Sequence, residues 1–275
     1  MKIIILILLF ILNLNSSNLT MGNEAYLKAD YEKAYSFYED ACAENRYVAC
    51  YNLGFAYESG HTKQKDYSKA VEYYKKACDG DVYNACYNLG LLYDKGKGVF
   101  EDKLKAIKLY TKSCEGGAYR SCHNLASLYT KKEYQDYKKA SVYFKKACDN
   151  DVNYSCMNLG VLYKQGLGVK QDYKIAHDLY EKACNAGIDI SCYNLALLYA
   201  KGKGLSKNYN IANKLYKRAC DNNISNACMN LGVSYYEGRS IEKSKVKAKI
   251  LFKKACTLGY VKACSYSKAL EDQGF

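Results

Sequence analysis

Fourteen cysteines constrain this chain more than any other feature, because they form seven pairs with the same internal spacing. Seven residues separate the two members of every pair, and successive pairs lie 36 residues apart except for one step of 34. An even number of cysteines at regular spacing is typical of a disulfide framework in an oxidising compartment. The sequence therefore predicts a tandem repeat with one disulfide in each repeat. The predicted disulfides are Cys42-Cys50, Cys78-Cys86, Cys114-Cys122, Cys148-Cys156, Cys184-Cys192, Cys220-Cys228 and Cys256-Cys264.

Two alternatives to this pairing use the same cysteines. Zinc sites use cysteines two to four residues apart or cysteines with histidines, and the three histidines have no regular relation to the pairs. We therefore expect no metal site and no cofactor. A pairing across 28 residues, such as Cys86 with Cys114, would leave Cys42 and Cys264 without partners. The short pairing is favoured because it uses all fourteen, and each closed loop would stabilise the fold by about 2–3 kcal/mol in the chain-entropy description.

Each repeat contains two segments with helical periodicity. In the first, Cys50, Leu53, Gly54 and Tyr57 follow the i, i+3, i+4, i+7 spacing of one helix face. A Gly-x-Gly turn such as 95–99 comes after it in several repeats, as expected where a helix ends on a residue with positive φ. The repeat that contains 129–134 lacks this turn, which accounts for the shorter step between cysteine pairs.

The second segment of each repeat carries two small residues and a large aromatic residue on one face. In one repeat these are Ala70, Tyr74 and Ala77, spaced by four and three residues. Asp66 stands just before this segment, where a carboxylate can accept hydrogen bonds from the free N–H groups of a helix. Each repeat is therefore predicted to be a helical hairpin that buries its apolar face only by stacking on its neighbours.

These elements predict an all-α fold, an α/α superhelical solenoid with one disulfide per repeat. Residues 18–275 are expected to form a single solenoid of about seven hairpins and a C-terminal capping helix near 262–270. Residues 1–17 have a charged start and an apolar run too short to span a bilayer, which is typical of a signal peptide. A buried first helix is the alternative. The chain is thus expected to be secreted or periplasmic, with no transmembrane segment once the signal is removed.

The formal net charge is +13, and 37 of the 41 basic residues are lysines. No nucleic-acid partner is expected, because arginine reads phosphates and bases better than lysine does. The lysines also recur along the whole array, which favours a solvated surface. The alternative is a basic scaffold that holds to acidic envelope or host surfaces, and strong salt dependence would identify it.

The Asn-Leu-Gly-x-x-Tyr helix, the Gly-x-Gly-Val turn and the Lys-Ala-x-x-x-Tyr-x-Lys-Ala-Cys helix resemble the Sel-one-like repeat, a longer relative of the tetratricopeptide repeat. The cysteine pairs and the predicted signal peptide make the chain similar to the Helicobacter cysteine-rich protein family in particular, over about residues 20–270. Members of that family are described as secreted or periplasmic proteins that bind penicillin-type compounds. Some are classed as weak β-lactamases that act on 6-aminopenicillanic and 7-aminocephalosporanic acid derivatives, and others are discussed as peptide-binding or host-interacting scaffolds.

The residues themselves do not point to an enzyme. A serine β-lactamase needs Ser-x-x-Lys together with Ser-Asp-Asn and Lys-Thr-Gly, and only the first motif occurs, at Ser240, Ser244 and Ser265 in a lysine-rich tail. No catalytic residue can be named from the sequence. A β-lactamase or a penicillin-binding protein is therefore what the resemblance implies, and the sequence pattern favours a binding protein.

A ladder of six asparagines is the candidate binding site. Each precedes a core leucine by one residue and so points about 100° away from it around the helix. The resemblance to tetratricopeptide repeats implies hydrogen bonds from these amides to a ligand backbone on the concave groove; the alternative is a structural bond to a neighbouring helix. The expected ligand is a peptide or protein, or a small β-lactam or cell-wall-derived compound, bound by a monomer. The ladder comprises Asn52, Asn88, Asn124, Asn158, Asn194 and Asn230.

Overall fold

The computed structural model describes residues 18–60 and 64–275. Every element in these residues is a helix, and none of the described residues forms a strand, so the all-α prediction is confirmed. The predicted signal peptide at 1–17 lies outside the described residues. None of the described helices is both long enough and apolar enough to cross a membrane.

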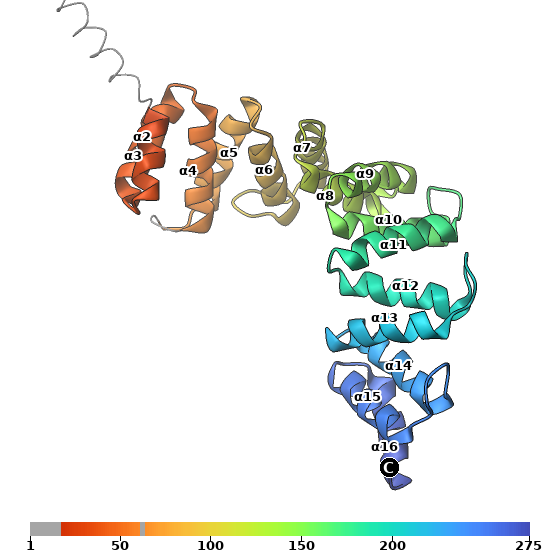
Figure 1. The fold of residues 1–275 in the computed structure, drawn as a ribbon. Coiled ribbons are helices and arrows are strands. Elements are labelled where there is room, and N and C mark those ends of the chain that lie inside the picture. Colours follow the sequence, from red (N-terminus) through yellow and green to blue (C-terminus); the bar gives the residue numbers. More distant parts are fainter. Residues whose placement is uncertain (1–17, 61–63) are drawn as a thin grey trace, which may run out of the picture. The chain divides into compact units, whose positions relative to one another are not determined.

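The chain divides into two compact units, Met1–Leu125 and Ala126–Phe275. We call them unit 1 and unit 2, and we call the two helices of each hairpin A and B in chain order. Within unit 1, helices that follow one another in the chain pack on each other (Figure 1). The A helices of unit 1 are α2 (Asn18–Leu27), α4 (Tyr47–Ser59) and α6 (Tyr83–Lys95), and the B helices are α3 (Tyr31–Ala43), α5 (Tyr67–Asp79) and α7 (Lys103–Glu115).

The A helix α8 (Tyr119–Tyr129) contains the boundary between the units. Unit 2 continues with three complete hairpins and the closing helix α16, and a 3₁₀ turn, η1 (Lys132–Tyr134), replaces the Gly-x-Gly turn before α9. The single solenoid over residues 18–275 stays a prediction. The remaining helices are α9 (Tyr137–Asp149), α10 (Asn153–Gln165), α11 (Tyr173–Asn185), α12 (Asp189–Lys201), α13 (Tyr209–Asp221), α14 (Ser225–Glu237), α15 (Lys245–Thr257) and α16 (Val261–Asp272).

Within a hairpin, a glycine of the A helix packs against an aromatic ring of the B helix. Cys50, Leu53, Gly54 and Tyr57 are all buried, as the helical spacing predicts. A Cβ added to Gly54 would lie 2.5 Å from the ring of Tyr74, closer than side chains pack without a shift. The small residue in this stripe is therefore what lets the two helices approach each other.

The turn between the A and B helices also touches the hairpin before it. Gly96 ends α6 with a φ of 62°, and Gly98 has a φ of 70°. A Cβ on Gly98 would overlap the backbone carbonyl group of Tyr67, the first residue of the preceding B helix. The second glycine of the Gly-x-Gly turn is thus required for contact between hairpins as well as for the backbone conformation.

A side chain caps the N-terminus of every B helix. Asp66 accepts hydrogen bonds from the backbone N–H groups of Ser68 and Lys69, at 2.9 and 3.0 Å. The capping predicted for Asp66 is confirmed, and the same position caps the other six B helices. The seven capping residues are Asp30, Asp66, Asp102, Asp136, Asp172, Asn208 and Ser244.

Each disulfide ties the last turn of one B helix to the first turn of the next A helix. The predicted pairing is observed in all seven repeats, with Cα–Cα distances of 4.6–4.9 Å. A basic side chain adds to several of these joints. The Nζ of Lys76 donates to the carbonyl oxygen of Cys42 at 2.7 Å, and Lys112 repeats this contact with Cys78 at 2.8 Å. Some of the many lysines therefore serve the scaffold itself.

Candidate functional site

The structure places one ladder asparagine on each of six A helices, α4 to α14, and all six side chains are partly buried. The ladder is thus distributed over both units, with three asparagines in each. Four of its members lie close enough to the preceding B helix to act on the large tyrosine there, and this distinguishes one asparagine from another: Asn52, Asn88, Asn124 and Asn230.

Asn88 lies beside the buried hydroxyl group of Tyr74, across the joint between two hairpins. That hydroxyl donates to a carboxylate oxygen of Glu58 at 2.7 Å. Burial raises the pKa of Tyr74, the charge of Glu58 raises this pKa further, and the hydrogen bond from the Asn88 amide lowers it. The pKa of Tyr38 is raised by burial and lowered by the amide of Asn52 in the same way. These amides therefore have a structural partner inside the molecule.

The same relation recurs with variations. Burial raises the pKa of Tyr216 to about 12, and the Asn230 amide acts against this rise. Asn124 acts on the pKa of Tyr110 similarly, although the Tyr110 hydroxyl forms no hydrogen bond within the described residues, so we regard the amide as a nearby dipole. The structural interpretation of the ladder is thus supported by an amide beside a buried tyrosine in several repeats.

Asn158 and Asn194 are the exceptions in the ladder. The hydroxyl of Tyr180, on the B helix before Asn194, has no hydrogen-bond partner within the described residues. On α9, the B helix that precedes Asn158, the residue equivalent to Tyr74 is Phe144, which has no hydroxyl group. Asn158 therefore has no tyrosine hydroxyl on the preceding B helix to bond to, unlike Asn88. Asn88 and Asn158 form a matched pair for separating a structural role from a ligand-binding role.

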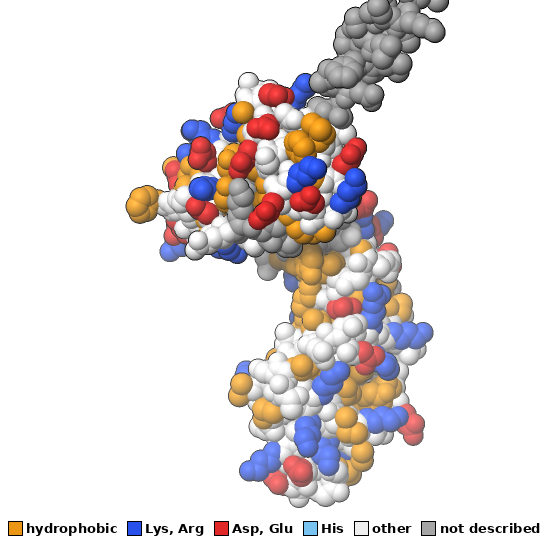
Figure 2. All heavy atoms as spheres, turned by 90° about the vertical axis from the view of Figure 1, so that its left-hand side faces the viewer, with side chains coloured by type: hydrophobic (Ala, Val, Ile, Leu, Met, Phe, Trp, Pro, Cys, Tyr) orange, Lys and Arg blue, Asp and Glu red, His pale blue; other side chains and the backbone are white. Residues whose placement is uncertain are grey.

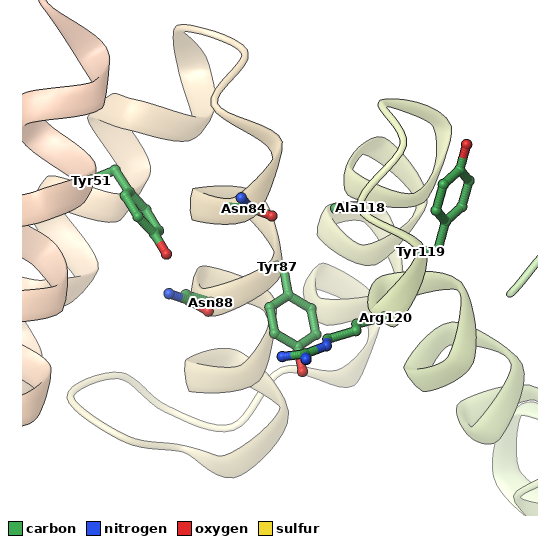
Figure 3. Close-up of a pocket in the computed structure, with 7 residues that line it drawn as sticks. All are labelled: Tyr51, Asn84, Tyr87, Asn88, Ala118, Tyr119 and Arg120. Atoms are coloured by element: carbon green, nitrogen blue, oxygen red, sulfur yellow. The ribbon is translucent and has the colours of Figure 1, made fainter. Parts of the chain in front are cut away.

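A pocket of about 370 Å³ opens on the A-helix side of unit 1 and contains one ladder asparagine (Figure 3). Helix α4 contributes one residue, α6 contributes three, and the start of α8 with the residue before it contributes the rest. In Figure 3 the guanidinium group of Arg120 reaches back toward the hydroxyl end of Tyr87. The lining residues are Tyr51, Asn84, Tyr87, Asn88, Ala118, Tyr119 and Arg120.

The lining of this pocket combines one positive charge with several hydrogen-bond donors. Arg120 supplies a planar set of N–H donors, Asn84 and Asn88 supply amides, and Tyr51 and Tyr87 supply phenols. No carboxylate belongs to the lining residues. Arginine with neighbouring donors recognises carboxylates and other planar anions in a directional way. We shall call this the Arg120 pocket.

Sequence reasoning identified Asn88 but did not identify Arg120 or Asn84. A signal was available, because both stand four residues before a ladder asparagine, on the same face of their A helices. Arg120 is also one of only four arginines in the chain. The asparagines give a periodic signal, whereas the residue type at the position four residues earlier changes from repeat to repeat.

A second pocket of about 260 Å³ surrounds another ladder asparagine of unit 1, Asn52. Its lining is mainly aromatic, and the hydroxyl of Tyr38 donates to the Asn23 side chain at 2.8 Å. Phe55 and Tyr26 remain 46% and 38% exposed there, so apolar surface is available to a ligand. The A-helix side of unit 1 therefore offers an aromatic pocket as well as a cationic one.

The serines of the Ser-x-x-Lys matches do not form a β-lactamase site in the structure. The hydroxyl of Ser244 accepts from the backbone N–H of Lys247 at 3.2 Å as a helix cap, and that of Ser265 donates to the carbonyl oxygen of Lys262 at 2.8 Å. Both hydroxyls thus bond within their own turn. No group of three or more potential metal-ligating side chains occurs among the described residues.

Comparison with protein-family profiles identifies one family along most of the chain. The profile described as the Sel1 repeat matches seven consecutive segments, at residues 20–45, 48–82, 84–117, 120–152, 153–188, 189–224 and 225–260. A comparison with curated protein sequences found no match.

Several solved structures are similar to this chain. A protective antigen of uropathogenic Escherichia coli strains, displaying an SLR fold, is 27% identical and has a TM-score of 0.86 over 94% of this chain. The match covers 56% of the length of that antigen. A Sel1 repeat protein from Oxalobacter formigenes is 28% identical over 88% of this chain and 97% of its own, with a TM-score of 0.73. Helicobacter pylori cysteine rich protein B is 32% identical over 46% of this chain and 93% of its own, with a TM-score of 0.39.

Proposed function

The chain belongs to the Sel1 repeat family, and from this premise we propose that it is an exported binding protein that holds a peptide on the A-helix side of unit 1. Sel1 repeats mediate protein interactions, which supports the general class. The finer proposal is that the Arg120 pocket binds a carboxylate of the ligand while the amides of Asn84 and Asn88 bond to its main chain.

The observation that supports this proposal is the composition of the Arg120 pocket. Its lining has donors in excess and no carboxylate to neutralise Arg120. A ligand carboxylate would accept hydrogen bonds from the guanidinium group, and a peptide main chain would use both the donors and the acceptors of the amides. The neighbouring aromatic pocket at Phe55 would accept an apolar side chain of the same peptide.

The direct test uses a library of short synthetic peptides, each prepared with a free and with an amidated C-terminus. Binding is measured by fluorescence polarisation to the wild-type protein and to Arg120→Gln. We expect the tightest peptides to lose affinity about tenfold on amidation, equivalent to about 1.4 kcal/mol, and to lose a similar factor with Arg120→Gln. Arg46→Gln is the matched control, because Arg46 is also exposed near the start of an A helix but is not part of the pocket.

Equal affinity for the free and amidated peptides, or equal losses with Arg120→Gln and Arg46→Gln, would contradict the proposal. A peptide that is bound by the wild type and lost with Arg120→Gln alone would support it. Circular dichroism of both variants checks that the helices remain intact.

The ladder asparagines are tested with the pair Asn88→Ala and Asn158→Ala. The structural role predicts that Asn88→Ala costs about 1–2 kcal/mol, because it removes a hydrogen bond to a buried hydroxyl, and that Asn158→Ala costs little. The ligand role adds a separate loss of peptide affinity with Asn88→Ala, measured well below its melting temperature. A drop in stability without any loss of affinity would assign Asn88 to the scaffold alone.

Export and β-lactam chemistry remain separate expectations. Seven disulfides and the family likeness are consistent with an extracytoplasmic location, and fractionation of cells into cytoplasm, periplasm and medium tests secretion directly. Binding or hydrolysis of β-lactams follows only from the resemblance to cysteine-rich relatives. A colorimetric assay on the pure protein tests it, and turnover no faster than in buffer would remove it.

A further inference from the structure

The excess positive charge of the chain is confined to unit 2. Residues 1–125 contain 16 basic and 15 acidic residues, whereas residues 126–275 contain 25 basic and 13 acidic residues. The expectation that lysines recur along the whole array is correct, but they are balanced by carboxylates in unit 1 only. A net charge of +12 on one unit is a separate feature that the Arg120 pocket in unit 1 does not explain.

Many of the uncompensated cations lie at one edge of unit 2, where the A and B helices of each hairpin are connected. In Figure 1 the turns that join α10 to α11 and α12 to α13 lie at the same side of unit 2, opposite the disulfide joints. We call this side the turn edge. Six lysines and a single carboxylate, that of Asp172, occupy the stretch of the turn edge formed by these two hairpins: Lys164, Lys170, Lys174, Lys201, Lys203 and Lys207.

These six lysines of the turn edge have no carboxylate partners. No ion pair joins any of these six lysines to an acidic side chain within the described residues, and Lys203 and Lys207 instead lie 5.5 and 4.8 Å from the centres of the Tyr173 and Tyr209 rings. Lys164 and Lys201 come from neighbouring hairpins. Burial lowers the pKa of Lys164, and the nearby charge of Lys201 lowers it further. The cations of successive hairpins therefore form one continuous surface.

The opposite edge of unit 2 differs. There two exposed lysines form ion pairs within their own helices, with Lys145 2.6 Å from Asp149 and Lys217 2.7 Å from Asp221. Figure 2, which views the molecule from that side, shows basic and acidic side chains of unit 2 interspersed with uncharged ones. The two edges are built from the same helices, so the excess of lysines over carboxylates in this stretch of the turn edge is a property of its variable residues.

The helix caps change in the same direction. The first five B helices are capped by aspartate, but α13 is capped by Asn208 and α15 by Ser244. A neutral cap satisfies the free N–H groups equally well, yet leaves the positive end of the helix dipole uncompensated. The last two hairpins thus lose a negative charge at the turn edge without losing the structural function of the cap.

We propose that the turn edge of unit 2 is a docking surface for an acidic, carboxylate-rich segment of a partner protein. The cations are lysines that repeat hairpin by hairpin along an edge, so they match an extended chain that carries several carboxylates. Lysine is a compact point charge without the forked donor geometry that favours phosphate and base recognition, which argues against nucleic acid. Electrostatic complementarity of this kind increases the association rate and selects acidic partners.

The test uses poly-glutamate as the probe and two variants of equal charge in the full chain. The first, Lys170→Gln, Lys174→Gln, Lys203→Gln and Lys207→Gln, neutralises the turn edge. The control neutralises four exposed lysines on B helices away from the turns: Lys145→Gln, Lys214→Gln, Lys217→Gln and Lys253→Gln. We expect the first variant to bind poly-glutamate at least about tenfold more weakly than the control does, with a reduced salt dependence.

Three outcomes would overturn the proposal. Equal losses in the two variants would mean that net charge alone attracts the probe. Absence of binding at low ionic strength would mean that the edge does not act on carboxylates. Tighter binding of a DNA duplex or of phosphatidylglycerol vesicles than of poly-glutamate, at the same ionic strength, would assign the edge to a different class of partner. Melting curves of both variants check that each remains folded.

Discussion

Unit 1 and unit 2 share one scaffold but carry different surfaces. Both are built from hairpins with the same cap position, the same disulfide and the same packing of a small residue against an aromatic ring. Unit 1 has balanced charge and a pocket of phenols, amides and Arg120. Unit 2 has a net charge of +12 and a cationic turn edge. The positions that repeat therefore hold the fold together, and the positions that vary distinguish what each unit can bind.

The difference extends to the A-helix positions beside the ladder. Tyr51 and Tyr87 line the Arg120 pocket in unit 1, whereas the equivalent positions in unit 2 are Met157, Tyr193 and Met229. Methionine replaces a rigid hydrogen-bonding ring with a flexible apolar chain. The two units would thus present different chemistry to a ligand even where the asparagine ladder continues.

The largest expected effect tests whether the scaffold is the same in both units. Gly98→Ala in unit 1 and Gly168→Ala in unit 2 each force a Cβ into the backbone of the preceding B helix. We expect each to cost about 2–4 kcal/mol, since backbone strain and a steric overlap act together. Chemical denaturation monitored by circular dichroism measures the cost.

The controls are Gly117→Ala and Gly187→Ala, which also have positive φ but have nothing within 4 Å of an added Cβ. Each control should lower the free energy of unfolding by about 1 kcal/mol, because of the backbone conformation alone. If the turn glycines cost no more than these controls, the turns do not pack on the neighbouring hairpins.

A smaller effect should separate two hairpins, one from each unit. Tyr74→Phe in unit 1 removes a hydroxyl that donates to Glu58 and accepts from Asn88, and we expect a loss of about 1–2 kcal/mol. Tyr180→Phe in unit 2 removes a buried hydroxyl that has no hydrogen-bond partner among the described residues, so this variant should be neutral or slightly stabilising. Equal losses would show that the hydroxyl of Tyr180 is bonded in solution.

The smallest effect is expected at high pH. Burial raises the pKa of Tyr216 from 10.0 to about 12, and it also raises the pKa values of Tyr74, Tyr110 and Tyr180. The folded state favours the neutral phenol, so these tyrosines contribute to the free energy of unfolding. This contribution is complete below pH 10 and is lost as the pH rises from 10 through 12. Phenolate absorbance should show a tyrosine fraction that ionises only with unfolding. Titration of all tyrosines near pH 10 without denaturant would contradict the burial.

The fold could be predicted because its determinants are local and repeated. The Cys spacing fixes the joint between hairpins, the Gly54 stripe fixes the packing inside a hairpin, and Asp66 marks where a B helix begins. Each signal occurs in several repeats, so chance matches are excluded by repetition. The absence of the Gly-x-Gly turn before α9 could be read from the sequence, where it accounts for the shorter step between cysteine pairs, but the 3₁₀ turn η1 in its place is seen only in the structure.

The candidate site could be predicted only in part, because recognition depends on residues that do not repeat. Asn88 was visible as a member of the ladder, but its contact with Tyr74 depends on how two hairpins stack. Arginine occurs at the position of Arg120 in one repeat only, so it gives no periodic signal. The charge difference between the units needs only the sequence, yet the boundary at Leu125 comes from the three-dimensional structure.

Hydrogen exchange on the full-length protein tests most directly the claim that one scaffold carries two separate binding surfaces. A carboxylate-terminated peptide that depends on Arg120 and the poly-glutamate probe would be added separately to the same preparation. The account predicts that the peptide slows exchange in α4, α6 and the start of α8, while poly-glutamate slows exchange at the turn edge around 164–174 and 201–209. Protection of the same segments by both probes would contradict it.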